Sequence, residues 1–252
     1  MPPPAESASA EPSSLLDRLT NVITSPGEVF DEVKSKPVDL QNWLVPLLLV
    51  CLAGIFYVTM AFSQPGILRG VEENQDKAMQ KQVAAGKMTQ AQADQASAMA
   101  AKFMNPTVLK IFGSGGATLA STAGLFFMAF GIWVGLKLCG AAPVSYMKLI
   151  EVCGLALVID VIQKIIRTSL VAWKENMLVT VSPTLFVQNP DMHNKRDIFL
   201  SFADPIDIWW LAVLSLGVSK VARVSYATAA LITFGLWFGF RVIATLLTPA
   251  AP

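Results

Sequence analysis

Residues 43–62, WLVPLLLVCLAGIFYVTMAF, carry no charged side chain. A run of about twenty such residues, coiled as an α-helix at about 1.5 Å per residue, crosses the roughly 30 Å of hydrocarbon in a bilayer. Backbone N–H and C=O groups find no water there, so a single spanning segment of this kind is helical. This stretch therefore predicts a transmembrane helix and makes the chain a membrane protein.

Further apolar segments follow the first one, and the chain is too apolar for an ordinary soluble protein, with 54% hydrophobic and 15% charged residues. The predicted fold class is all-α: a polytopic membrane protein with a bundle of five transmembrane helices in a membrane domain over residues 43–247. The expected spans are residues 43–62, 111–138, 149–171, 206–221 and 227–247.

Two polar segments lie between these spans. Residues 68–104 predict a helical hairpin outside the membrane, in which Gly86 ends one helix and Thr89 with Gln92 caps the next. Residues 174–203 contain a β-like stretch, LVTVSPTLFV, and the only histidine, His193. A lone histidine in a polar loop is expected to be solvated rather than to bind a ligand.

Two short amphipathic helices are expected in residues 15–42, after a disordered tail at residues 1–14. Pro26 occupies the first position of the second helix, where its missing N–H costs nothing. The expected capping boxes pair Ser14 with Asp17 and Ser25 with Glu28.

The second amphipathic helix has an apolar face formed by Val29, Phe30 and Val33. This face either lies on the bilayer or receives a partner protein, or else it packs on the chain's own loops. The net charge of +1 argues against strong binding to anionic lipid. It also removes the electrostatic case for a nucleic-acid partner.

Basic residues indicate the orientation, because short cytoplasmic loops carry an excess of lysine and arginine. The two longer segments together hold more basic residues, which by a plain count would place them inside. We follow the short loops, since longer segments cross the membrane despite their charge, and expect a cytoplasmic N-terminus with the C-terminus outside. The short-loop residues are Lys137, Lys148, Lys220 and Arg223.

Several motifs resemble those of the Yip family, the Ypt/Rab-interacting five-span membrane proteins. They are the pre-membrane SPGEVFDEVKSKP, the hairpin AGKMTQAQADQ, and FLSFADPIDIWWLAVLSLGVSK ahead of a last span. The resemblance covers about residues 20–247. It is strongest at Asp204, Pro205, Ile208, Trp209 and Gly217.

This resemblance implies a cytosolic N-terminus and a C-terminus on the opposite side. The short N-terminal tail and the polar hairpin are similar to the bacterial branch, which implies the bacterial cytoplasmic (inner) membrane. Eukaryotic relatives act as adaptors for prenylated Rab GTPases and in Golgi membrane trafficking. Rab binding does not transfer to a bacterial chain, and no catalytic residues come with the family.

No pattern of a catalytic, cofactor-binding or metal site is recognisable in the sequence. The stretch GSGGAT at residues 113–118 fails the spacings of phosphate-binding and dinucleotide-binding loops. The odd set Cys51, Cys139 and Cys153 lies in or beside apolar stretches, as expected of core residues rather than of a disulfide or metal set. We therefore expect no enzyme and no cofactor.

Charged residues inside the spans form a candidate intramembrane polar site. Asp160 lies near mid-membrane, where an aspartate costs roughly 3 kcal/mol, and Lys164 follows one helical turn later. Arg241, in the fifth span, should lie within about 5 Å of Asp160 in depth. In one interpretation these groups pair, either as a structural clamp or as a polar site along a transport path. In the other, the side chains of Lys164 and Arg241 extend to the membrane interface, and Asp160 is neutral or exposed to water.

Two GxxxG motifs, Gly131 with Gly135 and Gly235 with Gly239, permit close approach of helix backbones. They favour tight packing, either within the bundle or between copies of the chain.

Two functions follow from these observations. The first is a non-enzymatic membrane scaffold or adaptor that organises membrane or recruits partners. The alternative is a small transporter or channel that uses Asp160, Lys164 and Arg241. The expected partners are the lipid bilayer, a protein at the N-terminal amphipathic helices and further copies of the chain.

Overall fold

A computed structural model of the chain describes residues 13–247 apart from 104, 189 and 191–193. These residues contain helices and no β-strand, so the predicted all-α class is confirmed. The expected tail falls almost wholly outside the described residues, as does His193. The helices are α1 Leu15–Thr24, α2 Pro26–Ser35, α3 Gln41–Ala61, α4 Pro65–Ala84, α5 Gln90–Phe103, α6 Pro106–Leu138, α7 Tyr146–Lys174, a 3-10 helix Pro183–Phe186, α8 Lys195–Leu200, α9 Pro205–Ala222 and α10 Tyr226–Leu247.

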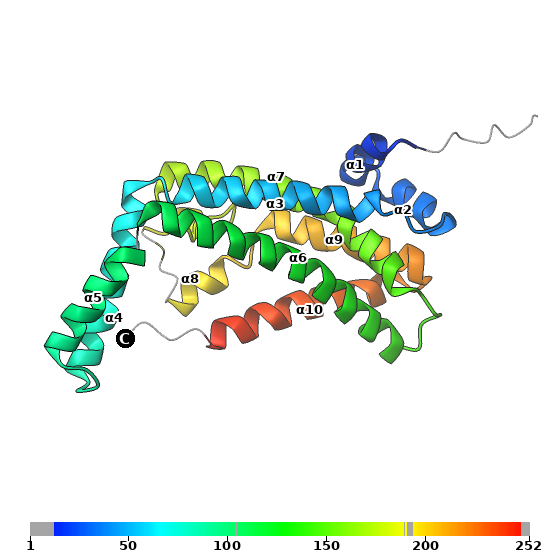
Figure 1. Ribbon diagram of the computed structural model, residues 1–252. Coiled ribbons are helices and arrows are strands. Elements are labelled where there is room, and N and C mark those ends of the chain that lie inside the picture. Colours follow the sequence, from blue (N-terminus) through cyan, green and yellow to red (C-terminus); the bar gives the residue numbers. More distant parts are fainter. Residues whose placement is uncertain (1–12, 104, 189, 191–193, 248–252) are drawn as a thin grey trace, which may run out of the picture.

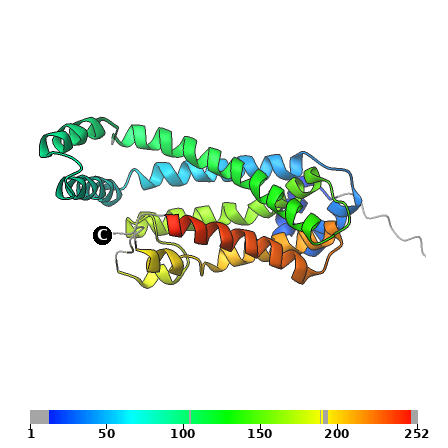
Figure 2. The ribbon, with the colours of Figure 1, turned by 90° about the horizontal axis from the view of Figure 1, so that it is seen from below.

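Helices α3, α6, α7, α9 and α10 run along one long axis and form the bundle (Figure 1). Helices α1 and α2 lie at one end of it, together with the loops that follow α6 and α9; we call this the N-terminal end. The polar hairpin α4–α5 extends from the opposite end, the hairpin end, as the view from below also shows (Figure 2). The chain therefore separates its amphipathic helices from its polar hairpin by the length of the bundle.

Within the described residues, α3, α6, α9 and α10 are long and apolar enough to cross a membrane. Helix α7, the expected third span, is not among them, because Lys148, Glu151, Asp160, Lys164 and Arg167 interrupt its apolar sequence. It is nevertheless the central helix, packed against α3, α6 and α9. The expected count of five spans therefore depends on α7 alone.

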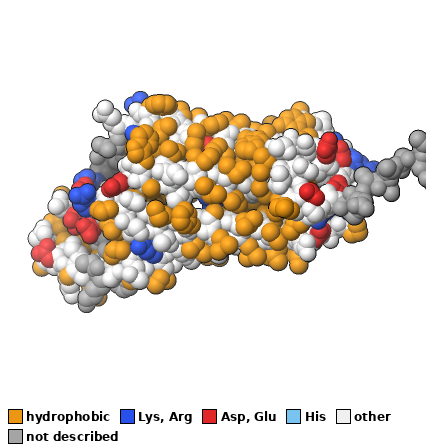
Figure 3. Space-filling model, turned by 90° about the horizontal axis from the view of Figure 1, so that it is seen from above, with side chains coloured by type: hydrophobic (Ala, Val, Ile, Leu, Met, Phe, Trp, Pro, Cys, Tyr) orange, Lys and Arg blue, Asp and Glu red, His pale blue; other side chains and the backbone are white. Residues whose placement is uncertain are grey.

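The surface of the bundle is that of an integral membrane protein. Apolar side chains cover its middle and charged side chains gather towards its two ends (Figure 3). Large apolar residues point outward from the bundle helices, among them Leu52, Phe127 and Phe240. Such an apolar belt is what hydrocarbon, rather than water, would cover.

Most predicted helix caps are present. The hydroxyl of Ser14 and the carboxylate of Asp17 form the expected capping box of α1, and Thr89 with Gln92 forms the one that starts α5. Gly86 adopts a positive φ of 65° where α4 ends. These signals depend only on neighbouring residues, which is why the sequence reveals them.

The predicted capping box of α2 is wrong. The Ser25 side chain makes no capping hydrogen bond, although Pro26 does occupy the first position of the helix. Ser25 is the only residue between α1 and α2, and its N–H still donates to the carbonyl of Asn21 at the end of α1. Its backbone is therefore held in a conformation, φ −137° and ψ 54°, that is not the extended one of an N-cap.

Two further expectations need correction. The stretch LVTVSPTLFV forms no strand; it contains the 3-10 helix, and the buried hydroxyls of Thr180, Ser182 and Thr184 bond to one another. No neighbouring strand is present among the described residues to pair with it. Cys51 and Cys153 are buried as expected, whereas Cys139 is exposed because it follows the last residue of α6.

Candidate functional site

One face of α7 is polar in the half nearer the hairpin end. Asp160, Gln163, Lys164 and Arg167 recur at spacings of three and four residues, which places them on one side of a helix. The structure puts Lys164 Nζ 2.6 Å from Asp160 Oδ2. Lys164 also lies beside Gly54 of α3, whose missing side chain leaves room for it. Both charges of this pair are thus held on the same helix.

Arg241 has a different partner from Asp160. Its Nη2 lies 3.0 Å from Asp207 Oδ2, and its guanidinium lies over the ring of Trp237, 4.4 Å from the centroid. On the other side, Gln163 Nε2 donates to Asp207 Oδ1 at 2.6 Å. The Asp207 carboxylate therefore joins α7, α9 and α10.

The position of the α9 start explains this arrangement. Asp204 caps α9 by accepting from the N–H of Ile206, and Pro205 is the first helical residue. Because Gln163 contacts Asp207, the first turn of α9 lies beside the middle of α7, not at its end. Asp207 therefore stands between α7 and Arg241.

The other residues of the family-like motif have roles in helix packing. Gly217 marks a close approach, since a Cβ there would lie 2.6 Å from Val152 Cγ1 and 2.8 Å from the Phe30 ring. Trp209 packs partly buried against the main core. Ile208 points outward and is 44% exposed. The motif thus determines where α9 begins and how closely α2, α7 and α9 approach.

The two GxxxG motifs face different surroundings. A Cβ at Gly131 would lie 2.9 Å from Leu236, and one at Gly135 would lie 2.7 Å from Ile232, so this pair lets α6 pack closely on α10. Gly235 and Gly239 have no side-chain or neighbouring-helix atom within 4 Å of their Cβ positions. They face away from the bundle.

A second polar cluster, at the N-terminal end, surrounds Glu151 of α7. This carboxylate is 1% exposed and accepts hydrogen bonds from Asn42 Nδ2 at 2.6 Å and from the N–H of Asp39 at 3.2 Å. Lys148 Nζ lies 2.6 Å from its other oxygen. Sequence reasoning missed this cluster because Glu151 was counted as part of an apolar span. The available signal was the spacing of three between Lys148 and Glu151.

The apolar face of α2 is buried against the bundle. Val29, Phe30 and Val33 are all buried, and the Phe30 ring lies at the Gly217 position of α9. At the edge of this contact, Lys220 Nζ of α9 lies 2.6 Å from Asp31 Oδ2. Helix α2 therefore packs on the membrane-spanning helices of the chain itself and not only on its loops.

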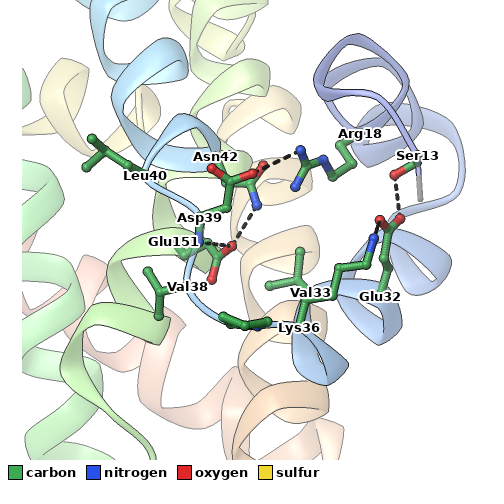
Figure 4. A pocket seen from close by; sticks show the side chains of 11 residues that line it. Ser13, Arg18, Glu32, Val33, Lys36, Val38, Asp39, Leu40, Asn42 and Glu151 are labelled. Atoms are coloured by element: carbon green, nitrogen blue, oxygen red, sulfur yellow. Dashed lines mark hydrogen bonds and ion pairs between the residues drawn. The ribbon is translucent and has the colours of Figure 1, made fainter.

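A pocket of about 410 Å³ opens between α1, α2 and the first turn of α3 (Figure 4). In it Arg18 Nη2 lies 3.0 Å from Asp39 Oδ2, and Lys36 and Ser13 both bind the Glu32 carboxylate. Burial alone would raise the pKa of Glu32, but the hydrogen bonds from Lys36 and Ser13 hold it below its ordinary value. The residues that line the pocket are Ser13, Arg18, Glu32, Val33, Lys36, Pro37, Val38, Asp39, Leu40, Asn42 and Glu151.

Comparison with known proteins gives one match. The Yip1 domain family model matches residues 20–247, nearly the whole described chain. No curated protein and no solved structure matches.

Proposed function

The chain belongs to the Yip family of membrane proteins, and from the way its N-terminal helices join the bundle we propose that it is a non-enzymatic membrane scaffold or adaptor. In this role α1 and α2 form a fixed platform on the cytoplasmic surface, which recruits partner proteins or organises the bilayer beside it. The single observation that carries the proposal is the anchoring of α2 to α7 and α9.

The anchoring uses both polar and apolar contacts. Lys148 Nζ donates to the carbonyl oxygens of Val33 and Lys36, at 2.9 Å and 3.0 Å, where α2 ends. Phe30 fills the space left by Gly217. Buried contacts of these kinds hold a short helix that would be marginal alone in water.

The outward face of this platform is mostly polar, with Leu16 as an exposed apolar residue. Asp17, Glu28, Asp31 and Lys34 lie on α1 and α2 outside their buried faces, and all four are exposed. A rigid polar surface suits reversible recruitment of a protein partner, because its side chains are already positioned and little order is lost on binding. Acidic and basic side chains are mixed over its described residues, which does not favour nucleic acid.

Two observations support five spans with a cytoplasmic N-terminus. On the charged face of α7, Lys164 lies beside α3 and pairs with Asp160, while Gln163 bonds to Asp207 of α9; this partial pairing lets the helix cross the bilayer. Lys137, Lys220 and Arg223 all lie at the N-terminal end of the bundle, on α6, on α9 and just after it. We place the protein in the bacterial inner membrane, with the hairpin α4–α5 and the C-terminus outside.

The rival function, a small transporter or channel, also has an observation in its favour. Asp160, Lys164, Asp207 and Arg241 are charged groups on the bundle helices α7, α9 and α10. They pair with one another inside the bundle, which is the arrangement of a structural clamp. A transport path would instead need at least one of them to exchange its partner for a solute.

Proximity labelling from a tag at the N-terminus tests the adaptor role. In the native chain the label should mark a reproducible set of neighbours, and Phe30→Asp should reduce that set while membrane insertion persists. Gln82→Asp, on the exposed surface of the hairpin at the other end of the bundle, introduces the same charge and is the matched control; it should leave the set unchanged. Identical neighbours for the native chain and Phe30→Asp would contradict a platform built on docked α2.

A further inference from the structure

The pocket at the N-terminal end contains two buried polar atoms that no described residue satisfies. They are Oδ1 of Asn42 and Nε of Arg18. Asn42 is 1% exposed, and only its amide nitrogen is engaged, by Glu151. Because buried polar atoms in proteins are nearly always hydrogen-bonded, two unpaired ones on residues that line one pocket call for partners that the described chain does not supply.

The unpaired atoms require opposite partners. Asn42 Oδ1 is an acceptor and needs an N–H or O–H donor, whereas Arg18 Nε is a donor and needs an acceptor oxygen. Charges of both signs line the same pocket: the carboxylates of Asp39 and Glu32, and the cations of Arg18 and Lys36. A ligand that carries both an ammonium and an anionic oxygen meets both requirements, and a simple anion or cation meets only one.

The rim of the pocket indicates where this ligand comes from. Val38 and Leu40 line the pocket and are 39% and 54% exposed, just ahead of the first span α3. Exposed apolar side chains at the start of a span lie at the membrane surface, where glycerol and acyl chains begin. The cavity of about 410 Å³ is of the size that accepts a small polar group.

We propose that this pocket binds the headgroup of a phospholipid that has a primary ammonium and a phosphate, of the phosphatidylethanolamine type. The ammonium donates to Asn42 Oδ1 and lies near the carboxylate of Asp39. The phosphate accepts from Arg18 Nε and lies near Lys36. The inference depends on the bundle spanning a membrane and is independent of the scaffold role.

Lipid retention by the purified full chain in detergent tests this site, measured by native mass spectrometry with three lipids of equal acyl chains. Phosphatidylethanolamine should be retained most. The ammonium of phosphatidylcholine has no N–H, and the hydroxyl groups of phosphatidylglycerol, although they can donate to Asn42, carry no positive charge to lie beside Asp39. Arg18→Gln should lower its retention about tenfold, as expected when a hydrogen bond to a charged group is lost. Lys34→Gln, which removes a cation of α2 that does not line the pocket, is the control and should change nothing.

Asn42→Leu should also abolish the preference, but this variant removes a hydrogen bond to Glu151. Arg18→Gln removes the ion pair with Asp39, so Arg18→Lys, which keeps the charge beside Asp39 but lacks the Nε donor, is the decisive variant and should lower retention as well. Equal retention of the three lipids by the native chain, or a preference that survives Arg18→Gln or Arg18→Lys, would overturn the site. Soluble phosphoethanolamine distinguishes the source of the group. If it displaces the lipid at equal concentration, the lipid assignment is wrong and the pocket takes a soluble ligand; if the lipid stays bound, the assignment is supported.

Discussion

Lys148 Nζ contacts Glu151 Oε2 at 2.6 Å and from the same position binds the last carbonyl groups of α2. One ammonium group thus neutralises a buried carboxylate and caps the C-terminal end of an amphipathic helix. This pair is the polar part of the contact that fixes α2 to the bundle.

Replacing Lys148 with Met should destabilise the protein by on the order of 3 kcal/mol, because the buried Glu151 carboxylate loses its counter-charge. Thermal unfolding in detergent measures the effect. The double variant Lys148→Met/Glu151→Gln should recover part of the loss, since the neutral amide needs no counter-charge. Lys34→Met, on the exposed side of α2, serves as the control. A double variant less stable than Lys148→Met alone would show that the pair does not act in this way.

Gly217→Ala should destabilise the packing of α2, α7 and α9. The added methyl group would lie 2.6 Å from Val152 Cγ1, and overpacking of this kind costs about 1–3 kcal/mol. Gly235→Ala makes the same chemical change in α10, where the Cβ position is open, and should leave stability unchanged or slightly raised. Equal thermal shifts for the two variants would contradict the close approach at Gly217.

Vesicles that contain the purified protein should show no ion or solute flux above that of empty vesicles. The reason is that Asp160 and Lys164 pair with each other, as do Asp207 and Arg241, so these charges already have partners within the bundle. Flux assays with ions and small solutes measure this directly. Reproducible flux that Asp160→Asn abolishes would overturn the scaffold proposal in favour of a transporter.

Topology can be tested with single cysteines in a chain carrying Cys139→Ser, since the other two native cysteines are buried. An impermeant thiol reagent applied to intact cells should label Gln82→Cys in the hairpin. It should reach Ser13→Cys only after the membrane is permeabilised. The reverse pattern would invert the proposed orientation.

Features that depend on neighbouring residues were predictable from the sequence. The Asp204–Pro205 start of α9 and the Thr89–Gln92 start of α5 each follow from a short pattern of side-chain caps. The apolar face of α2 was also predicted, because helical periodicity places Val29, Phe30 and Val33 together. The helices that bury this face could not be named, since which spans lie beside it depends on the packing of the whole bundle.

Polar contacts between helices were the part that sequence reasoning missed. Counting residues along the spans predicted that Asp160 and Arg241 lie at similar depths in the membrane. Depth alone does not give the rotation of each helix about its axis, and so it does not say which side chains face each other. Asp207, in the first turn of α9, occupies the position beside Arg241. The same limit applies to Glu151, whose burial depends on Asn42 and on the end of α2.

Hydrogen exchange of the full chain in lipid vesicles tests the central claim, that α2 is a fixed part of the bundle, most directly. The amides from Val29 to Val33 should exchange as slowly as those around Gly217 in α9, because α2 is anchored by Lys148 and packed through Phe30. Lys148→Met should speed exchange in α2 while leaving the middle of α9 protected. If the α2 amides of the native chain exchange as fast as those of an unstructured peptide, α2 is not docked and the platform does not exist.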